Sequence, residues 1–124
     1  RALARDGFDL VVCGLREEAL VAPALAQLRD DGAAAHYVRA DVAEHDDRLR
    51  LVSEIRHRLG RLHVLVNNAG CNVRKRALDV TWDDWNLVLE TNLRGTFFVA
   101  QGAAAAMAER GGAMVMLADI AALL

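Results

Sequence analysis

The sequence predicts an α/β fold with three layers, in which a doubly wound parallel sheet lies between helices on both faces. Three observations support this prediction. Short apolar runs alternate with segments of helical spacing, each helical segment stops at or near a glycine, and polar motifs follow the apolar runs. Alternation of this kind is typical of right-handed βαβ crossovers, which place successive strands parallel. We expect one partial domain over residues 1–124, incomplete at both ends.

The chain opens with a predicted helix and a predicted strand. Arg1–Asp6 has the pattern of the last turns of a helix, and Gly7 follows it as a C-cap glycine. Phe8–Cys13 is a short apolar run with Val11 and Val12 at its centre. Such a run suits a strand that is buried on both faces.

Two amphipathic helices and a second strand are predicted next. Glu17–Asp30 and Glu44–Leu59 carry apolar residues at helical spacing, and a glycine follows each of them. Pro23 falls within the first of these helices, so we expect it either near the first turn or at a kink. His36–Ala40, between the helices, is predicted to be a strand.

The second half of the chain repeats the alternation with a longer helix. Leu62–Val66 is a strongly apolar third strand. Thr81 and Asp84 have the spacing of a capping box, although Asp replaces the usual Glu or Gln, and the helix is expected to reach about Glu109. Two glycines break this helix, and Ala113–Ala118 is the last predicted strand.

Composition argues against several classes of protein. The formal net charge of -2 provides no broad positive field for nucleic-acid phosphates. The longest apolar stretch, Phe97–Met107, is far too short to span a bilayer. Cys13 and Cys71 form neither a CxxC motif nor a disulfide framework, which predicts free thiols in a reducing cytoplasm.

The ends of the chain and its histidines support two further expectations. The chain lacks an initiator Met and begins and ends within recognisable patterns, which indicates a fragment, and no secretory signal is visible. The histidines show no plausible metal-ligand grouping, so we expect no metal site and surface positions for His36, His45, His57 and His63.

Polar motifs follow the predicted strands, where open parallel sheets bind ligands. These motifs are Gly14–Arg16, Asp41-Val42, Asn67–Cys71 and the residues after Leu117. In Asn67–Gly70, two amides can hold the strand end in one shape, and the small Ala-Gly pair lets a flat ligand approach the main chain. A generic turn is the alternative, since Asn and Gly are common in turns.

Asn67–Gly70, together with Asn92–Gly95 in the following helix, resembles the short-chain dehydrogenase/reductase family. The resemblance covers Ala2 to Leu124 and implies a Rossmann-type fold. Within the family, the resemblance is to 3-oxoacyl-acyl-carrier-protein reductases and gluconate 5-dehydrogenase-like members. It implies hydride transfer between a nicotinamide cofactor, NADP or NAD, and a small keto or hydroxy substrate that an acyl carrier protein can carry. It also implies a homo-oligomer for the full-length parent.

The same resemblance implies roles for the strand-end residues. Asp41 accepts a hydrogen bond from the adenine amino group, and Val42 supplies an amide and an apolar edge. Asn68, Ala69 and Gly70 lie along the ribose and nicotinamide side. For Asp41, a helix N-cap is the compatible alternative.

Residues Gly14–Arg16 bear on the choice of cofactor. A carboxylate at this strand end binds the ribose 2′-hydroxyl and repels a 2′-phosphate. The resemblance aligns Gly14 with that acid, and Arg16 is near enough to pair with a phosphate, so NADP(H) is favoured over NAD. Alternatively, Arg16 pairs with Glu17, Glu18 or solvent.

Two residues concern catalysis. The resemblance implies that the backbone of Asn92 holds a water in a proton relay to a catalytic Lys and Tyr; a locally satisfied polar helix position is the alternative. Asp119 aligns with the family's substrate-polarising Ser, and an ionised carboxylate cannot donate a hydrogen bond. Asp119 therefore supports a second hypothesis, a non-catalytic binding or assembly module that keeps the fold.

The family's glycine-rich loop would precede Arg1, and its Tyr-x-x-x-Lys motif would follow Leu124. We therefore expect the isolated chain to be inactive, and to expose unpaired strand edges. Two features stay open. Arg74–Arg76 is either a contact for an acidic substrate or carrier, or a solvated loop. The small residues of Gly102–Ala106 form either a subunit interface or an internal helix contact.

Overall fold

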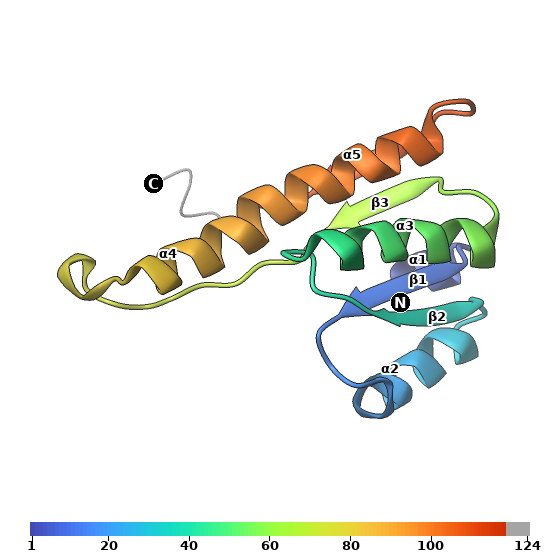
Figure 1. The fold of residues 1–124 in the computed structure, drawn as a ribbon. Coiled ribbons are helices and arrows are strands. Elements are labelled where there is room, and N and C mark those ends of the chain that lie inside the picture. The colour runs from blue at the N-terminus through green and yellow to red at the C-terminus, as the bar shows by residue number, and fades with distance from the viewer. Residues whose placement is uncertain (119–124) are drawn as a thin grey trace.

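A computed structural model of the chain describes residues 1–118. Helices and strands alternate along it as the sequence predicts, with element ends shifted slightly (Figure 1). In order, the elements are α1 (Ala2–Arg5), β1 (Leu10–Gly14), α2 (Glu18–Asp30), β2 (Ala35–Arg39), α3 (His45–Leu59), β3 (Val64–Asn67), η1 (Ala77–Asp79), α4 (Trp82–Leu89), η2 (Glu90–Gly95), α5 (Thr96–Met107) and β4 (Ala113–Met116).

The strands form two parallel pairs. β1 pairs with β2, with Leu10 opposite Ala35, and β3 pairs with β4, with Val64 opposite Ala113. The arrowheads of β1 and β3 point the same way in Figure 1, so the strand ends that carry the motifs lie toward one side. The pairs are separate two-stranded sheets, because no strand within residues 1–118 lies hydrogen-bonded between β1 and β3.

The hydrophobic core lies where α3 covers the β1–β2 pair. Val38, Ala40 and Leu51 are buried together, and Val11 and Ile55 pack against them. Helical spacing along α3 brings Leu51 and Ile55 onto one face, whereas its other positions are mostly charged. The position of α3, and with it the turn that precedes α3, therefore depends on this core.

The small residues of α5 pack within the molecule. Ala103 is buried, and a Cβ added at Gly102 would lie 2.9 Å from the Val52 side chain of α3. Close approach of two helices requires small side chains at such positions, so the internal-contact alternative is confirmed for these two residues. A role of α5 in subunit pairing stays a prediction.

Of the two alternatives for Pro23 in helix α2, a place near the first turn is wrong, and a kink stays a prediction. Pro23 lies well inside Glu18–Asp30 rather than in the first turn. The helix continues on both sides of it, and only Leu25 among its residues is buried. The missing amide of Pro23 therefore falls in an exposed helix, where water can satisfy the carbonyl left free one turn earlier.

The long helix predicted from Thr81 is present, and its capping box is confirmed. The Asp84 amide donates to the Thr81 hydroxyl at 3.2 Å, and the Asp84 carboxylate accepts from the Thr81 amide at 2.9 Å. α4, η2 and α5 form one continuous helical rod in Figure 1, in which α4 extends away from the strands. The middle segment, η2, is a π-helical turn.

The capping box predicts an acid-dependent loss of stability. The Lys75 ammonium, 2.6 Å from the Asp84 carboxylate, and the Thr81 amide lower the pKa of Asp84 from 3.8 to about 2. Because the folded pKa is below the unfolded value, this stabilisation is present above about pH 4 and is lost as the pH falls toward 2. In thermal unfolding followed by circular dichroism, Asp84→Asn should lower the Tm at neutral pH.

The difference in Tm between Asp84→Asn and the wild type should vanish as the pH falls toward 2. Asp83→Asn is the matched control, because Asp83 lies in the same helical turn and its carboxylate makes no hydrogen bond within the described residues. A Tm difference for Asp84→Asn that is independent of pH would contradict the role of the ionised carboxylate.

Candidate dinucleotide site

Three loops leave the carboxyl ends of strands and carry most of the predicted site residues. They are Gly14–Glu17 after β1, Asp41–Glu44 after β2 and Asn67–Cys71 at the end of β3. Asp119, the predicted residue after β4, lies outside the described residues. The helical rod passes two of these loops, and its π-helical turn contacts both.

Asn92 joins the π-helical turn to the loop after β3. Its side-chain oxygen accepts from the Cys71 amide at 2.8 Å, and its side-chain amide donates to the Cys71 carbonyl at 2.8 Å. The side chain thus pairs with both backbone groups of one residue, Cys71, as a neighbouring strand would. Local satisfaction of Asn92, the alternative from the sequence, is therefore confirmed for its side chain.

At helical spacing, Asn92 shares a face of the rod with Trp85 and Leu89, and this face is not buried. All three residues are exposed. Within residues 1–118, α4 makes its main contacts with η2, and no strand of this part of the chain makes comparable contacts with α4. In addition, the π turn widens the helix, so the 3.6-residue spacing does not continue through Asn92.

Asn67 anchors the start of the same loop. It is 6% exposed, and its side-chain amide donates to the Thr96 carbonyl at 2.8 Å. The next three residues, Asn68, Ala69 and Gly70, are exposed. The motif is therefore divided: Asn67 holds the strand end against the helix, and the residues proposed to face the cofactor are open to solvent.

Gly95 joins the π-helical turn to the loop after β2. A Cβ added at Gly95 would lie 2.7 Å from the Val42 carbonyl oxygen, closer than real Cβ atoms approach. Only glycine therefore allows the helix to lie this close to the Val42 backbone. The turn Asn92–Thr96 consequently touches both loops, Val42 through Gly95 and Asn67–Cys71 through its two ends.

Asp41 closes a tight turn instead of capping a helix. One oxygen of its carboxylate, Oδ1, accepts from the Ala43 amide at 2.9 Å, whereas the N-cap of α3 is Glu44. The N-cap alternative is therefore wrong. The Asp41 amide donates to the Asp47 carboxylate at 2.7 Å, and this bond, with Arg50, lowers the pKa of Asp47.

Arg16 lies exposed in the loop after β1. Its backbone carbonyl accepts from the Tyr37 hydroxyl at 2.8 Å, while its guanidinium makes no ion pair within residues 1–118. Glu17, one of its predicted partners, instead pairs with Arg39. No sequence pattern distinguishes Arg39, whose guanidinium also donates to the Leu15 carbonyl at 3.1 Å.

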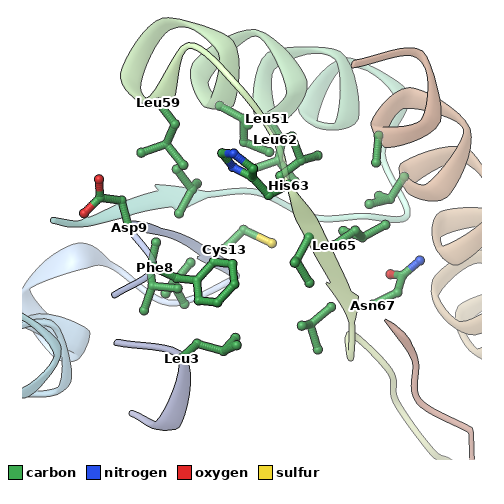
Figure 2. Close-up of a pocket in the computed structure, with 18 of the residues that line it drawn as sticks. Leu3, Phe8, Asp9, Cys13, Leu51, Leu59, Leu62, His63, Leu65 and Asn67 are labelled. Atoms are coloured by element: carbon green, nitrogen blue, oxygen red, sulfur yellow. The ribbon is translucent and has the colours of Figure 1, made fainter. Parts of the chain in front are cut away.

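A further cavity lies within residues 1–118. It measures about 410 Å³ and lies between the β1 and β3 strands, where Cys13 and Leu65 face it (Figure 2). Its walls are mostly apolar side chains, with Phe8 and Leu51 among them. Val42, Asn67 and Ala69 of the candidate loops are among its lining residues, so the cavity reaches the carboxyl ends of the strands. Its mostly apolar wall nevertheless suits a missing strand neighbour better than a charged dinucleotide, and we do not assign the cofactor to it.

Other features of the sequence bear less on the site. Lys75 of the basic loop pairs with Asp84, which supports the solvated-loop alternative for this residue. Cys13 and Cys71 are free thiols, as predicted. Within the described residues, no helix is long and apolar enough to cross a membrane.

The exposed groups of the three loops suit a dinucleotide. The second oxygen of Asp41, Oδ2, has no hydrogen-bond partner within residues 1–118 and can accept from an amino group. Ala69 and Gly70 present a small, open main-chain surface, and the free Arg16 guanidinium suits a phosphate. An acceptor, a flat surface and a cation at the carboxyl ends of strands from the two sheets match the chemistry of adenine, nicotinamide and phosphate.

Parallel strands with motif-bearing carboxyl ends place this chain among Rossmann-type nucleotide-binding folds. Over residues 1–124 it matches the family described as Enoyl-(Acyl carrier protein) reductase. The chain belongs to the short-chain dehydrogenase/reductase family of NAD(P)-dependent oxidoreductases. Both the fold class and the family predicted from the sequence are confirmed.

Three similar proteins illustrate the relationship. A short-chain dehydrogenase/reductase of Armillaria gallica is 36% identical over 110 residues, covering 88% of this chain and 42% of that protein. The 3-oxoacyl-acyl-carrier-protein reductase FabG of Staphylococcus aureus is 32% identical over 124 residues, covering 95% and 48%. The crystal structure of an actinorhodin polyketide ketoreductase variant with NADPH superimposes with a TM-score of 0.87 at 34% identity, covering 94% and 46%.

The chain spans less than half of the length of these three proteins.

Proposed function

We propose that the whole protein is an NADP(H)-preferring oxidoreductase that interconverts a keto and a hydroxy group, with a 3-oxoacyl group on an acyl carrier protein as the favoured substrate class. One observation carries the proposal. The π-helical turn η2, together with Thr96 directly after it, contacts the loops after β2 and β3. It thereby holds together the two parts of an extended site that a dinucleotide would occupy.

The roles proposed for the loops are those that the family resemblance implies, and the geometry of the loops supports them. Asp41 offers its free carboxylate oxygen to the adenine amino group, and Val42 lines the adenine. Asn68, Ala69 and Gly70 support the ribose and nicotinamide side. When bound, the nicotinamide supplies the hydride; the residues of this chain bind and orient it.

Asn92 is proposed to act through its main chain. Both polar atoms of its side chain are used by Cys71, so the side chain cannot serve a substrate. The backbone carbonyl within the π-helical turn is the group left for holding a water in a proton relay. The side chain then fixes the position of that carbonyl.

The preference for NADP(H) is supported by Arg16 and by the absence of an acid at Gly14. The free guanidinium of Arg16 can pair with a 2′-phosphate. Gly14 has no carboxylate that would repel this phosphate. The crystal structure of the actinorhodin polyketide ketoreductase variant contains NADPH, which also supports this preference. The acyl-carrier substrate class is supported by the name of the staphylococcal relative. We further propose a cytoplasmic homo-oligomer that makes no use of a metal.

Asp119 favours a second candidate function, a non-catalytic binding or assembly module. At the proposed position of a substrate-polarising Ser, an ionised carboxylate repels developing negative charge. Such a module would bind the nucleotide without turning a substrate over.

The test compares the whole protein, its Asp119→Ser variant and the isolated chain. NADPH and NADH oxidation are followed with 3-oxoacyl thioesters and simple ketones, and nucleotide binding is followed by calorimetry. We expect the whole protein to oxidise NADPH in preference to NADH, and the isolated chain to show no turnover. Nucleotide binding without turnover, with turnover restored by Asp119→Ser, would establish the second candidate. No binding of either nucleotide would reject both.

A further inference from the structure

Arg48 is a buried cation in an unfavourable place. It is 8% exposed and lies in the first turn of α3, where the helix dipole opposes a positive charge. No carboxylate within residues 1–118 forms an ion pair with it. Because burying an unpaired charge is costly, stability alone does not account for an arginine at this position.

The contacts of Arg48 are with the turn after β2 and with helix α5. Its Nη1 donates to the Val42 carbonyl at 2.6 Å and to the Ala43 carbonyl at 2.7 Å. Its guanidinium carbon lies 5.5 Å from the centre of the Phe98 ring, within the range of a cation–π contact. Arg48 therefore links the turn to the helix that carries the π-helical segment.

The rest of the turn is held by other means. Asp47 fixes the Asp41 amide, and the Asp41 carboxylate fixes the Ala43 amide. Arg48 alone among the described side chains hydrogen-bonds the carbonyls of Val42 and Ala43. The Val42 carbonyl is also the atom that Gly95 approaches, so its position is set from two sides.

We propose that Arg48 is a positioning residue for the adenine half of the bound dinucleotide. By holding the carbonyls of Val42 and Ala43, it keeps the Val42 amide and side chain in the shape that receives adenine. This inference rests on the proposed nucleotide site. Arg48 touches the turn and not the nucleotide, so its loss weakens binding without removing a contact to the cofactor.

The experiment uses the whole protein with Arg48→Met and, as a matched control, Arg56→Met on the exposed side of α3. Calorimetry measures the affinity for 2′,5′-ADP, which contains only the adenosine half. We expect Arg48→Met to weaken it roughly five- to tenfold, as for the loss of one or two hydrogen bonds. The KM for NADPH should rise by a similar factor, with kcat unchanged.

Amide hydrogen exchange without nucleotide gives an independent readout. The Ala43 amide should exchange faster in Arg48→Met than in the wild type, and Arg56→Met should change neither exchange nor binding. Arg48→Lys, which keeps the charge but forms fewer directed bonds, should give an intermediate affinity and provides a second variant if Met impairs folding.

Three outcomes decide the matter. Wild-type affinity for 2′,5′-ADP in Arg48→Met, with unchanged Ala43 exchange, would overturn the inference and leave the proposed function standing. If kcat and Tm fall together in Arg48→Met, and Arg48→Lys restores none of the affinity for 2′,5′-ADP, the role of Arg48 is merely structural. This result also overturns the inference. Failure of the wild type to bind 2′,5′-ADP or NADPH would instead overturn the proposed function, and the inference with it.

Discussion

Replacing Gly95 by Ala should destabilise the protein by about 1–3 kcal/mol, the usual cost of forcing an extra methyl group into a packed site. The new Cβ would lie 2.7 Å from the Val42 carbonyl oxygen and 3.0 Å from its carbonyl carbon. Both are backbone atoms. The β1–β2 pairing and Arg48 hold that segment, so the clash cannot be relieved by rotating a side chain.

The sign of the Gly95→Ala effect is informative. In an unobstructed helix, Ala is more favourable than Gly by about 1 kcal/mol, so without the clash the substitution would stabilise the protein. Urea unfolding of the whole protein measures the difference. Gly14→Ala is the matched control, since its added Cβ would meet only the Tyr37 hydroxyl, at 3.3 Å. A stabilising Gly95→Ala would mean that the helix does not lie against Val42.

Gly95→Ala should also weaken nucleotide binding, because the added Cβ forces the Val42 carbonyl to move away from the helix. Calorimetry with NADPH should show lower affinity for Gly95→Ala, and unchanged affinity for a stability-matched core variant such as Ala103→Gly. If Gly95→Ala and Ala103→Gly lost NADPH affinity equally, general destabilisation would explain the loss.

Local periodicity was sufficient to predict the elements. β1 and its neighbours follow apolar runs, and α3 follows a 3.6-residue pattern, so their order and approximate bounds could be read from the chain. The start of β1 was placed too early, at Phe8. The Phe8 amide bonds the Leu3 carbonyl to close α1, and Asp9 bonds the Ala34 amide, so neither residue is free to join the strand.

Strand pairing could not be predicted in the same way. The sequence predicts a single sheet, whereas the strands form two separate pairs. Periodicity indicates where a strand lies along the chain, but it does not indicate which other strand lies beside it. The cavity between β1 and β3 is the consequence: Leu65 and Cys13 face each other across it instead of contacting a shared neighbour. The unpaired edges expected for this chain are therefore present at β1 and β3.

The candidate site was predicted in part. Its loops are marked by residue types that favour turns and ligands, so Asp41 and the Asn67–Gly70 motif could be singled out. The contacts that join the loops could not. Arg48 resembles any other charged residue of a helix, and the proximity of Gly95 to Val42 joins residues far apart in sequence.

Replacing Asn92 by Asp should have the second largest effect among these variants. The shape of the side chain is kept, and its oxygen can still accept from the Cys71 amide. In the wild type, the side-chain amide of Asn92 donates to the Cys71 carbonyl at 2.8 Å. In Asn92→Asp, a carboxylate oxygen takes the place of this amide, so two oxygens face each other. Loss of one bond with an unfavourable contact in its place should cost about 1–3 kcal/mol of unfolding free energy.

The functional consequence of Asn92→Asp should exceed its effect on stability. The loop after β3 is tied to the π-helical turn through Cys71, so its release would move Asn68–Gly70 relative to Val42. NADPH affinity of the whole protein, measured by calorimetry, should therefore fall by about tenfold, the factor that corresponds to 1.4 kcal/mol.

Asn86→Asp provides the matched control for Asn92→Asp. Asn86 is exposed on α4, one turn and more before the π segment, and its side chain makes no hydrogen bond within the described residues. The same change of charge there should leave both stability and affinity nearly unchanged. If the two variants lost affinity equally, added negative charge along the rod would explain the loss, and the pairing of Asn92 with Cys71 would have no part in holding the site together.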